Sequence, residues 1–467
     1  MTTKLKICLL ASVLILGYTS LSFELIVLRQ LVSFVGANTL VTSIIMAFVL
    51  LFLSLGYYLG SVCHFSHIVF RKYMRCIIGG LAMWYIIACS YYFVSLFFAL
   101  LYWKFTLSAL MLTTLYSAVF LALPSIGLGF ITAGIGRIMH RFDSDYTGRF
   151  MAIDTVGSVL GSLLTTLVFM PLIGVEATIS VLVLLTLSVS LLTARKNKRV
   201  LVWLQFGLMA CLLWVLNLPQ ITDPEHVLIK NDAISRIEIV PVAGEGDFDS
   251  KIMQLNGQLA SKFSTDDEKF FYYIQYINNT FINNLPQSGE PAKILVLGAG
   301  GFTVGIHDEY NLYTYVDIDK DLQKISEQRF LPEPLSDNKK FVAQDAYFYM
   351  LSNKEKYDLI VVDIFSDLTN IPINFVTVDF FRMVKAHLAD NGFMIANIFT
   401  SPLFDTPFAQ RIDNTLRHVF EHSLSRQIIQ NYNPYQQSDN VNVLYIYRNH
   451  PAKSDIYTLD KNTAVYR

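Results

Sequence analysis

Residues 293–321 read KILVLGAGGFTVGIHDEYNLYTYVDIDKD, and this stretch decides the fold of the second half of the chain. An apolar run at 294–297 breaks into the turn Gly298-Ala-Gly-Gly301, and a second apolar run ends at Asp317. Glycine allows a tight turn and lets a ligand approach the backbone at the start of a helix. A carboxylate after the second strand can accept hydrogen bonds from two ribose hydroxyls. The stretch therefore predicts a nucleotide pocket.

The flanking sequence extends this pattern into a sheet. From residue 293 onward, strand-like runs alternate with helix-like runs, and two last apolar runs at 426–432 and 442–448 predict a closing hairpin. Such alternation predicts a doubly wound α/β sheet that binds ligands at the carboxyl ends of its strands, here with an antiparallel edge. Upstream, the runs at 235–242 and 251–257 predict a small β-strand domain, which a helix and a linker follow.

The first part of the chain is too apolar for a soluble protein. Of all 467 residues, 53% are hydrophobic and only 16% are charged, and the excess lies before residue 218. A membrane-spanning helix needs about 20 apolar residues. Seven segments predict seven spans: 7–33, 39–63, 75–102, 107–136, 149–172, 175–194 and 199–217. We interpret the first as a retained span rather than a signal peptide. Small residues spaced four apart predict close helix packing, as at Gly157 and Gly161.

Three domains follow from this division: a transmembrane helical domain at 1–217, a small β-strand domain with its linker helix at 218–287, and a nucleotide-binding domain at 288–467. Basic residues gather in alternate connections: Lys4, Lys6, Arg71, Lys72, Arg75, Arg137, Arg141, Arg149, Arg195, Lys196, Lys198 and Arg199. The positive-inside rule then places the N-terminus in the cytoplasm and, after seven spans, the second half outside.

Other features limit the class of function. The net charge of −1 and the absence of a basic stripe give no argument for a nucleic-acid partner. All five cysteines lie in the apolar part, and no Cys/His cluster has metal-binding spacing, so we expect no metal site. Three ionisable residues lie inside apolar runs, namely Glu24, Arg29 and Asp154. They indicate transport or substrate entry, unless Glu24 and Arg29 pair with each other or lie at the membrane surface.

Further acids follow the other strands of the predicted sheet. Asp345 comes after the third strand, and Asp363 and Asp367 after the fourth. Carboxyl ends of parallel strands meet at one edge, so these acids should converge on one crevice. A dinucleotide fingerprint would need glycine where Thr303 stands, which weakens an NAD interpretation. Two alternatives stay open from the residues alone: a glycine turn without any ligand, and an Asp363 that merely caps a loop.

These motifs resemble the spermidine synthase (aminopropyltransferase) family. The similar motifs are VLGAGG at 296–301, VDID at 316–319, QDA at 344–346 and YDLIVVDIFSD at 357–367, preceded by SRIEIV at 235–240 and FFYYIQ at 270–275. The apolar half, with FELIVLRQLVSFVGA at 23–37 and GRFMAIDTVGSVLGSLL at 148–164, resembles the membrane segment of bacterial membrane-fused spermidine synthase-like proteins. The resemblance implies a Rossmann-like, methyltransferase-type sheet and a multi-pass protein of the bacterial inner (plasma) membrane.

The resemblance also implies a co-substrate site. The family binds decarboxylated S-adenosylmethionine and transfers its aminopropyl group to an amine, as in polyamine biosynthesis. By resemblance, Gly298, Gly300 and Gly301 form the turn against the co-substrate, Asp317 holds its ribose, and Asp345 holds its adenine. Gly301, however, replaces an acid that would bind the aminopropyl ammonium. The implied partners are a small amine, membrane lipid and a second copy of the chain.

On the amine side, the resemblance implies that Asp363 accepts a proton from the attacking amine. Asp367 would help to hold the amine's charge, although it stands one position later than the family's second acid. Tyr272, with its neighbour Tyr273, would position the amine. Three further departures remove polar side chains that the family pattern carries: Ser235, Ala260 and Ile274 stand in their places.

Because the nucleoside half of the site matches better than the amine half, two alternatives remain. One is an S-adenosylmethionine-dependent methyltransferase, which would not need an acid at position 301. The other is a transporter or sensor that binds a polyamine or nucleoside without turnover. The predicted topology also conflicts with a co-substrate made in the cytosol, so the side that the soluble half faces stays open.

Overall fold

The computed structural model describes residues 3–36, 39–63, 65, 67–104, 109–141, 146–193, 199–216, 227–242, 250–265, 270–285, 287–364, 373–429 and 440–449. The contacts between residues divide the chain into two units, which we describe separately. Unit 1 comprises Met1–Pro241 and Gln254–Leu259, and unit 2 comprises Val242–Met253 and Ala260–Arg467. The domain boundaries expected after residues 217 and 287 remain predictions.

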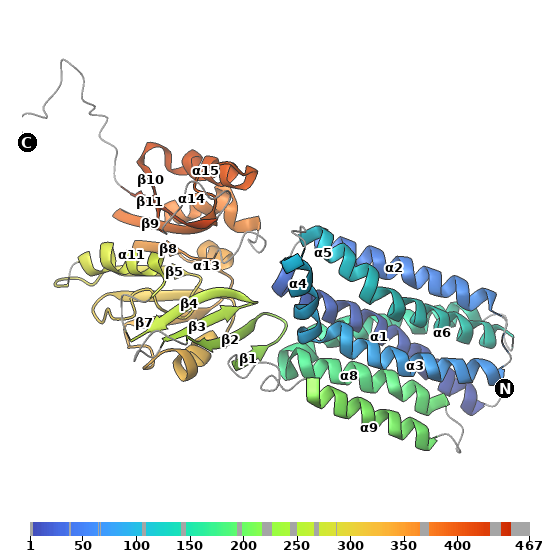
Figure 1. Ribbon diagram of the computed structural model, residues 1–467. Coiled ribbons are helices and arrows are strands. Elements are labelled where there is room, and N and C mark those ends of the chain that lie inside the picture. Colours follow the sequence, from blue (N-terminus) through green and yellow to red (C-terminus); the bar gives the residue numbers. More distant parts are fainter. Residues whose placement is uncertain are drawn as a thin grey trace, which may run out of the picture. The chain divides into compact units, whose positions relative to one another are not determined.

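Unit 1 is built mainly from long apolar helices that lie side by side (Figure 1). They are α1 (Thr3–Val35), α2 (Thr39–Val62), α3 (His67–Cys89), α4 (Tyr91–Lys104), α5 (Ala109–Tyr116), α6 (Ala122–His140), α7 (Tyr146–Leu164), α8 (Met170–Thr193) and α9 (Arg199–Leu216). The unit also contains the antiparallel pair β1 (Val227–Asn231) and β2 (Arg236–Pro241). Many large apolar side chains of the helices are exposed, as expected for helices that face lipid.

Several helices are long and apolar enough to cross a membrane. Four such stretches are Leu5–Val35, Thr39–Val62, Leu110–His140 and Thr147–Thr193, and the bent pair Val69–Cys89 and Tyr91–Leu101 would make a fifth. The prediction of several apolar helices long enough to be spans is thus confirmed, but the number seven is not. The segments predicted at 149–172 and 175–194 fall within one 47-residue stretch, and the last predicted span yields only the shorter apolar helix Val202–Leu213 among the described residues.

Glycines set how closely two of these helices approach. A Cβ atom on Gly157 would lie 2.2 Å from the carbonyl oxygen of Leu14, and one on Gly161 would lie 2.3 Å from that of Tyr18. Only glycine fits at such distances, so α7 rests directly on the backbone of α1. The packing interpretation of these small residues is therefore confirmed.

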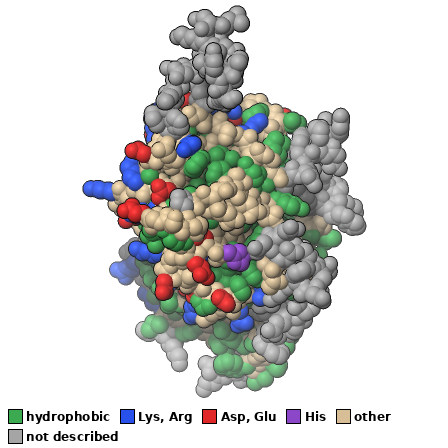
Figure 2. Space-filling view, turned by 90° about the vertical axis from the view of Figure 1, so that its left-hand side faces the viewer, with side chains coloured by type: hydrophobic (Ala, Val, Ile, Leu, Met, Phe, Trp, Pro, Cys, Tyr) green, Lys and Arg blue, Asp and Glu red, His purple; other side chains and the backbone are tan. Residues whose placement is uncertain are grey.

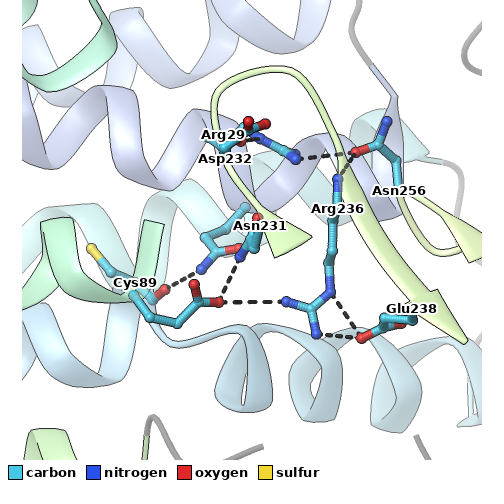
Figure 3. Close-up of polar contacts among 9 residues, drawn as sticks. Arg29, Cys89, Asn231, Asp232, Arg236, Glu238 and Asn256 are labelled. Carbon is cyan, nitrogen blue, oxygen red and sulfur yellow. Dashed lines mark hydrogen bonds and ion pairs between the residues drawn. The ribbon is translucent and has the colours of Figure 1, made fainter. Parts of the chain in front are cut away.

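The buried charge of α1 contacts the strands of unit 1. Arg29 donates from Nε to the carbonyl oxygen of Asp232 at 2.6 Å and from Nη2 to Oδ1 of Asn256 at 3.1 Å (Figure 3). Both partners lie more than 200 residues away along the chain. The alternative that Arg29 pairs with Glu24 is therefore wrong, and Arg29 instead joins a helix to two β turns.

A second buried arginine organises the same region. The guanidinium of Arg236 forms an ion pair with Glu238 and lies 3.6 Å from Oε1 of Glu176 on α8 (Figure 3). It also stacks on Tyr91, with 3.4 Å between Cζ and the ring centroid. Nδ2 of Asn231 donates to Glu176 at 2.6 Å. These contacts make the β1–β2 pair part of the helical unit.

Unit 2 contains a seven-stranded sheet with helices on its faces (Figure 1). Its elements are α11 (Tyr272–Thr280), β5 (Lys293–Leu297), β6 (Leu312–Asp317), α12 (Leu322–Ile325), β7 (Lys339–Ala343), α13 (Ala346–Ser352), β8 (Tyr357–Val362), α14 (Val378–Ala386), β9 (Leu388–Thr400), α15 (Pro407–Phe420), β10 (Leu424–Ile428) and β11 (Val441–Arg448). The strand order is β10-β11-β9-β8-β5-β6-β7, parallel from β9 to β7 and antiparallel at β10 and β11. The predicted Rossmann-like sheet with an antiparallel terminal hairpin is confirmed.

The central strand of this sheet is wholly apolar because both faces of the sheet are covered. All four residues from Ile294 to Leu297 on β5 are fully buried. On the face in Figure 2, scattered acidic and basic side chains lie among patches of hydrophobic ones.

A second, four-stranded sheet has the order β1-β2-β3-β4, with β3 at Ser250–Leu255 and β4 at Gln258–Ser264. The strands predicted at 235–242 and 251–257 are thus present. A separate small β domain is not confirmed, however, because the division into units assigns β1 and β2 to unit 1 and most of β3 and β4 to unit 2.

Candidate functional site

The carboxyl ends of four parallel strands bring most of the predicted site residues together. The chain passes from β5 to β6 and β7 on one side, then returns to β8 on the other side of β5. Such a reversal opens a crevice where ligands bind. Gly298 follows β5, Asp317 ends β6, Asp345 follows β7, and Asp363 follows β8. The predicted convergence of these residues on one edge of the sheet is what the structure shows.

Gly298 holds the glycine turn against the end of β8. Its φ is +89°, and a Cβ atom on it would lie 2.3 Å from the carbonyl oxygen of Asp363. A side chain at this position would therefore require the two strand ends to separate. The sequence needs glycine here for the turn and Asp363 to be neighbours.

Gly301 is glycine for a different reason. A Cβ atom on it would lie 2.2 Å from Cε1 of Phe330, a fully buried ring, and 2.9 Å from Cβ of Ser261. The Ser261 hydroxyl oxygen accepts the backbone N–H of Gly301 at 2.8 Å. The space that an acidic side chain would need at position 301 is thus filled by Phe330 and Ser261. The absence of the family's acid at position 301 is therefore matched by the packing of Phe330 and Ser261 around Gly301.

Asp317 is held by two backbone donors. Its Oδ2 accepts the N–H of Ala299 in the glycine turn at 3.1 Å, and its Oδ1 accepts the N–H of Asp319 at 3.1 Å. Burial raises the pKa of Asp317, although these N–H groups oppose the rise. Each carboxylate oxygen can accept a second hydrogen bond, so the group can bind hydroxyl donors of a ligand.

Asp345 caps the helix α13. Its Oδ1 accepts the backbone N–H groups of Tyr347 at 2.8 Å and Phe348 at 3.3 Å. This is the usual role of an aspartate that precedes a helix. Because one carboxylate oxygen makes both bonds, the capping role still leaves Oδ2 for a ligand.

Asp363 has two side-chain donors. The hydroxyl of Tyr273 donates to Oδ2 at 3.0 Å, and Nδ2 of Asn397 donates to Oδ1 at 2.8 Å. Burial raises the pKa of Asp363 to about 6, even though the bonds from Asn397 and Tyr273 lower it. Burial and the neighbouring carboxylate raise the pKa of Tyr273 well above its usual value, so its hydroxyl stays a donor. The arrangement fixes a carboxylate that can exchange a proton near neutral pH.

Asn397 is a site residue that the sequence did not reveal. It lies on β9, is only 3% exposed, and its Oδ1 has no hydrogen-bond partner among the described residues. A buried acceptor without a donor is costly, so it suits a ligand that brings an N–H or O–H group. The signal in the sequence that could have indicated this residue is its own amide side chain, which interrupts the apolar run FMIANIF at 393–399.

The remaining predicted residues separate from this group. The side chain of Tyr272 is 61% exposed at the start of α11, whereas Tyr273 is buried against Asp363. Asp367 lies outside the described residues. Across the described ranges, no three His, Cys, Asp or Glu side chains are grouped so that they could hold a metal ion.

Comparison with known proteins gives a family match in the same region. Residues 272–436 match the family model described as spermine/spermidine synthase domain. A polyamine aminopropyltransferase of Sulfurisphaera tokodaii is 32% identical over 186 residues, which cover 37% of this chain and 57% of that protein. Polyamine aminopropyltransferase 2 of Aquifex aeolicus is 25% identical over 264 residues, covering 52% of this chain and 51% of that protein. The chain thus spans little more than half the length of these relatives.

Solved structures show a partial likeness of the same kind. A probable spermidine synthase of Corynebacterium glutamicum shares 22% identity with a TM-score of 0.38, covering 50% of this chain and 82% of that one. The spermidine synthase of Thermotoga maritima shares 17% identity with a TM-score of 0.37, covering 48% of this chain and 73% of that one.

Proposed function

We propose that this chain, whose residues 272–436 match a spermine/spermidine synthase domain, is an aminopropyltransferase, which moves the aminopropyl group of decarboxylated S-adenosylmethionine to an amine. The observation that carries the proposal is the buried carboxylate of Asp363, held by Tyr273 and Asn397 beside the glycine turn. A protein that only bound a nucleoside would not need a proton acceptor at this point of the crevice.

The proposed chemistry follows from the charges of the reactants. An amine is an ammonium at neutral pH and must lose a proton before it can attack carbon. Asp363 accepts that proton, because its pKa of about 6 leaves it ionised at pH 7 and above. The co-substrate's sulfonium supplies a good leaving group, so what remains for the protein is to orient the amine.

Two neighbouring groups serve that orientation. The Tyr273 hydroxyl and the Asn397 amide fix the carboxylate from both sides. The unpartnered Oδ1 of Asn397 offers the incoming amine a second acceptor. An ammonium carries three N–H donors, so an acceptor pair made of Asp363 and Asn397 suits it.

The nucleoside part of the co-substrate would lie along the other strand ends. Gly298 keeps the turn free of side chains, Asp317 would accept from the ribose hydroxyls, and Asp345 would accept from the adenine amino group. The site lacks an acid at position 301, since Phe330 and Ser261 fill that space. The contacts to the transferred aminopropyl group therefore differ from the family pattern.

Calorimetry on the detergent-purified chain tests the proposal. We expect decarboxylated S-adenosylmethionine to bind more tightly than intact S-adenosylmethionine. Asp317→Ala should weaken binding of the decarboxylated form by about tenfold or more, because a charge-assisted hydrogen bond contributes about 1.5–3 kcal/mol. Asp358→Asn, on β8 but at its far end, is the matched control and should bind as the wild type does.

Two results would contradict the proposal. Tighter binding of intact S-adenosylmethionine would point to methyl transfer on the same sheet. Binding of neither compound would leave a polyamine or nucleoside transporter or sensor as the remaining function.

We further propose that unit 1 crosses a membrane seven times and anchors the enzyme. The direction of α7 supports this count. Leu14, Tyr18 and Ser22 of α1 contact Gly157, Gly161 and Thr165 in the same order, so α1 and α7 run parallel. Two helices that run parallel must be separated by an even number of reversals of chain direction. Four reversals separate α1 from α7 if α7 is the fifth span.

The direction of α8 supports a reversal after α7. The backbone is non-helical at Gly174, with φ 79° and ψ 171°. Just beyond it, Glu176 contacts Asn231 of β1, and at the other end of α8 the carbonyl oxygen of Thr193 accepts from Arg71 near the start of α3. The far end of α3, at Cys89, contacts Gln30 of α1. Helix α8 therefore runs back along the bundle, so that α7 and α8 would be two spans.

Reporter fusions test this topology. A reporter that is active only outside the cytoplasm should be active when fused after Arg467 and inactive when fused after Arg141, since the basic connections face the cytoplasm. The Arg141 fusion is the control, because it shows how the reporter behaves on the cytoplasmic side. Activity of a cytoplasmic reporter alone at Arg467 would overturn the seven-span count and place the soluble half beside the cytosolic co-substrate.

A further inference from the structure

A cavity at the basic end of the helices has no part in the proposed transferase. It has a volume of about 350 Å³ and lies between the end of α2, the last turns of α6 and the start of α7. Its lining residues are Ser61, Ala133, Gly136, Arg137, Met139, His140, Arg141, Thr147, Phe150 and Met151. The cavity is entirely within unit 1.

The walls of this cavity are apolar. Met139 is buried, Phe150 is partly buried, and Met151 is 63% exposed at the helix surface. Gly136 leaves one wall without a side chain, since a Cβ atom there would lie 3.3 Å from the Phe150 ring. An apolar cavity at the lipid-facing surface of a helix bundle suits a hydrocarbon chain better than a soluble ion.

Three basic side chains lie at one end of the same cavity. Arg137 and His140 lie in the last turn of α6 and Arg141 caps its end; His140 and Arg141 stand three and four residues after Arg137, so the three share one face of the helix end. Arg137 donates from Nη1 to the carbonyl oxygen of Ser61 at 3.2 Å, which orients its guanidinium. His140 and Arg141 are exposed, and none of the lining residues is acidic.

Basic residues in the last turn of a helix also offset the helix dipole, and they obey the positive-inside rule. Charge alone would therefore indicate no ligand. The observation that does indicate a ligand is the apolar cavity beside these residues, because neither the helix dipole nor the positive-inside rule requires a cavity. Asp143 and Asp145 of the adjoining connection lie outside the described residues, and the described ionisable side chains that line the cavity are the three basic ones.

We infer that this cavity binds an anionic phospholipid, with the acyl chain against Met139 and Phe150 and the phosphate beside Arg137, His140 and Arg141. Cytoplasmic leaflets carry anionic lipid, and basic sites between spanning helices at that side bind its head groups. The inference requires that the helices lie in a membrane. It does not require transferase activity, so a result that disproves the lipid site leaves the proposed transferase activity untouched, and the reverse also holds.

Native mass spectrometry of the full chain tests this site, after purification in a mixture of phosphatidylglycerol and phosphatidylcholine. We expect the wild type to retain phosphatidylglycerol in preference to phosphatidylcholine. The double variant Arg137→Gln with Arg141→Gln should lower that retention by about fivefold for each charge lost, the amount expected for one basic residue near a membrane surface. Arg141→Gln alone should give a single step of this size.

Arg149→Gln is the matched control. Arg149 is exposed on α7 near the same helix ends but does not line the cavity, so its loss should leave retention unchanged. Thr147→Trp keeps every charge and places a large side chain in the cavity, so it should lower retention as well. Each variant should elute from size exclusion as the wild type does, which shows that it is folded.

Three outcomes would overturn the inference. Equal losses in Arg149→Gln and in Arg141→Gln would indicate a general surface-charge effect. Equal retention of the two lipids would exclude an anionic head-group site. Competition by glycerol phosphate at the same concentration as the lipid would indicate an anion site without acyl-chain recognition.

Discussion

Asp363→Asn is expected to lower the rate of group transfer by about 10²- to 10⁴-fold, which is the usual contribution of a general base. Asparagine has nearly the same shape as aspartate, and its one carbonyl oxygen can still accept from Asn397, while its NH2 group can donate to the hydroxyl oxygen of Tyr273. It cannot take up a proton from an ammonium. Binding of the co-substrate, measured by calorimetry, should therefore stay within about threefold of the wild type while turnover falls.

The control for this variant lies on the same strand. Asp358 is at the opposite end of β8, where its Oδ2 accepts the N–H of Lys293 at 2.8 Å, a bond that an asparagine oxygen can also make. Asp358→Asn should therefore retain the wild-type rate. A rate for Asp363→Asn within threefold of the wild type would show that the carboxylate is not the base.

The pH profile identifies the same group without removing it. Below a pKa of about 6 the Asp363 carboxyl is protonated and cannot accept a proton, so the rate should rise as the pH increases through about 6. The Tyr273 hydroxyl bonds to the charged form and lowers this pKa. Tyr273→Phe should therefore move the rise to higher pH. A profile that is flat from pH 5 to 8 would contradict the assignment.

The sequence predicted the nucleotide-binding sheet well because its signals are local. The central strands β5 and β8 of unit 2 are largely apolar runs, and polar site residues stand where the strands end, as Asp317 and Asp363 do. Parallel strands bring their carboxyl ends together without any further information. Asn397 escaped notice because it lies inside its strand, where alternation and apolar content give no sign of which face meets the site.

The long-range polar contacts were beyond prediction for a different reason. Arg29 contacts Asp232 and Asn256 across more than 200 residues of chain, and no local pattern encodes such a pairing. The nearest candidate partner in sequence, Glu24, was the natural alternative and is wrong. The filled space at Gly301 is similar, because only the packed structure shows that Phe330 occupies it.

Arg236→Ala is expected to lower the stability of unit 1 by about 3–5 kcal/mol, because removal of one partner from a buried ion pair leaves the other charge uncompensated. The side chains of Arg236 and Glu238 are 6% and 8% exposed, and Glu176 lies within 3.6 Å of the same guanidinium. The change also removes the stacking of Arg236 on Tyr91. Thermal unfolding in detergent should show a loss on the order of 10 °C.

Two further variants separate charge from packing. The double variant Arg236→Met with Glu238→Met removes both charges and keeps apolar volume over Tyr91, so it should recover most of the lost stability. Arg149→Gln removes an exposed charge from the same unit and should change the midpoint by less than about 2 °C, since exposed charges contribute little. If Arg236→Ala melts within that same margin, the buried cluster does not hold β1 and β2 in the helical unit. A double variant as unstable as Arg236→Ala would instead show that hydrogen-bond geometry, rather than charge balance, stabilises the region.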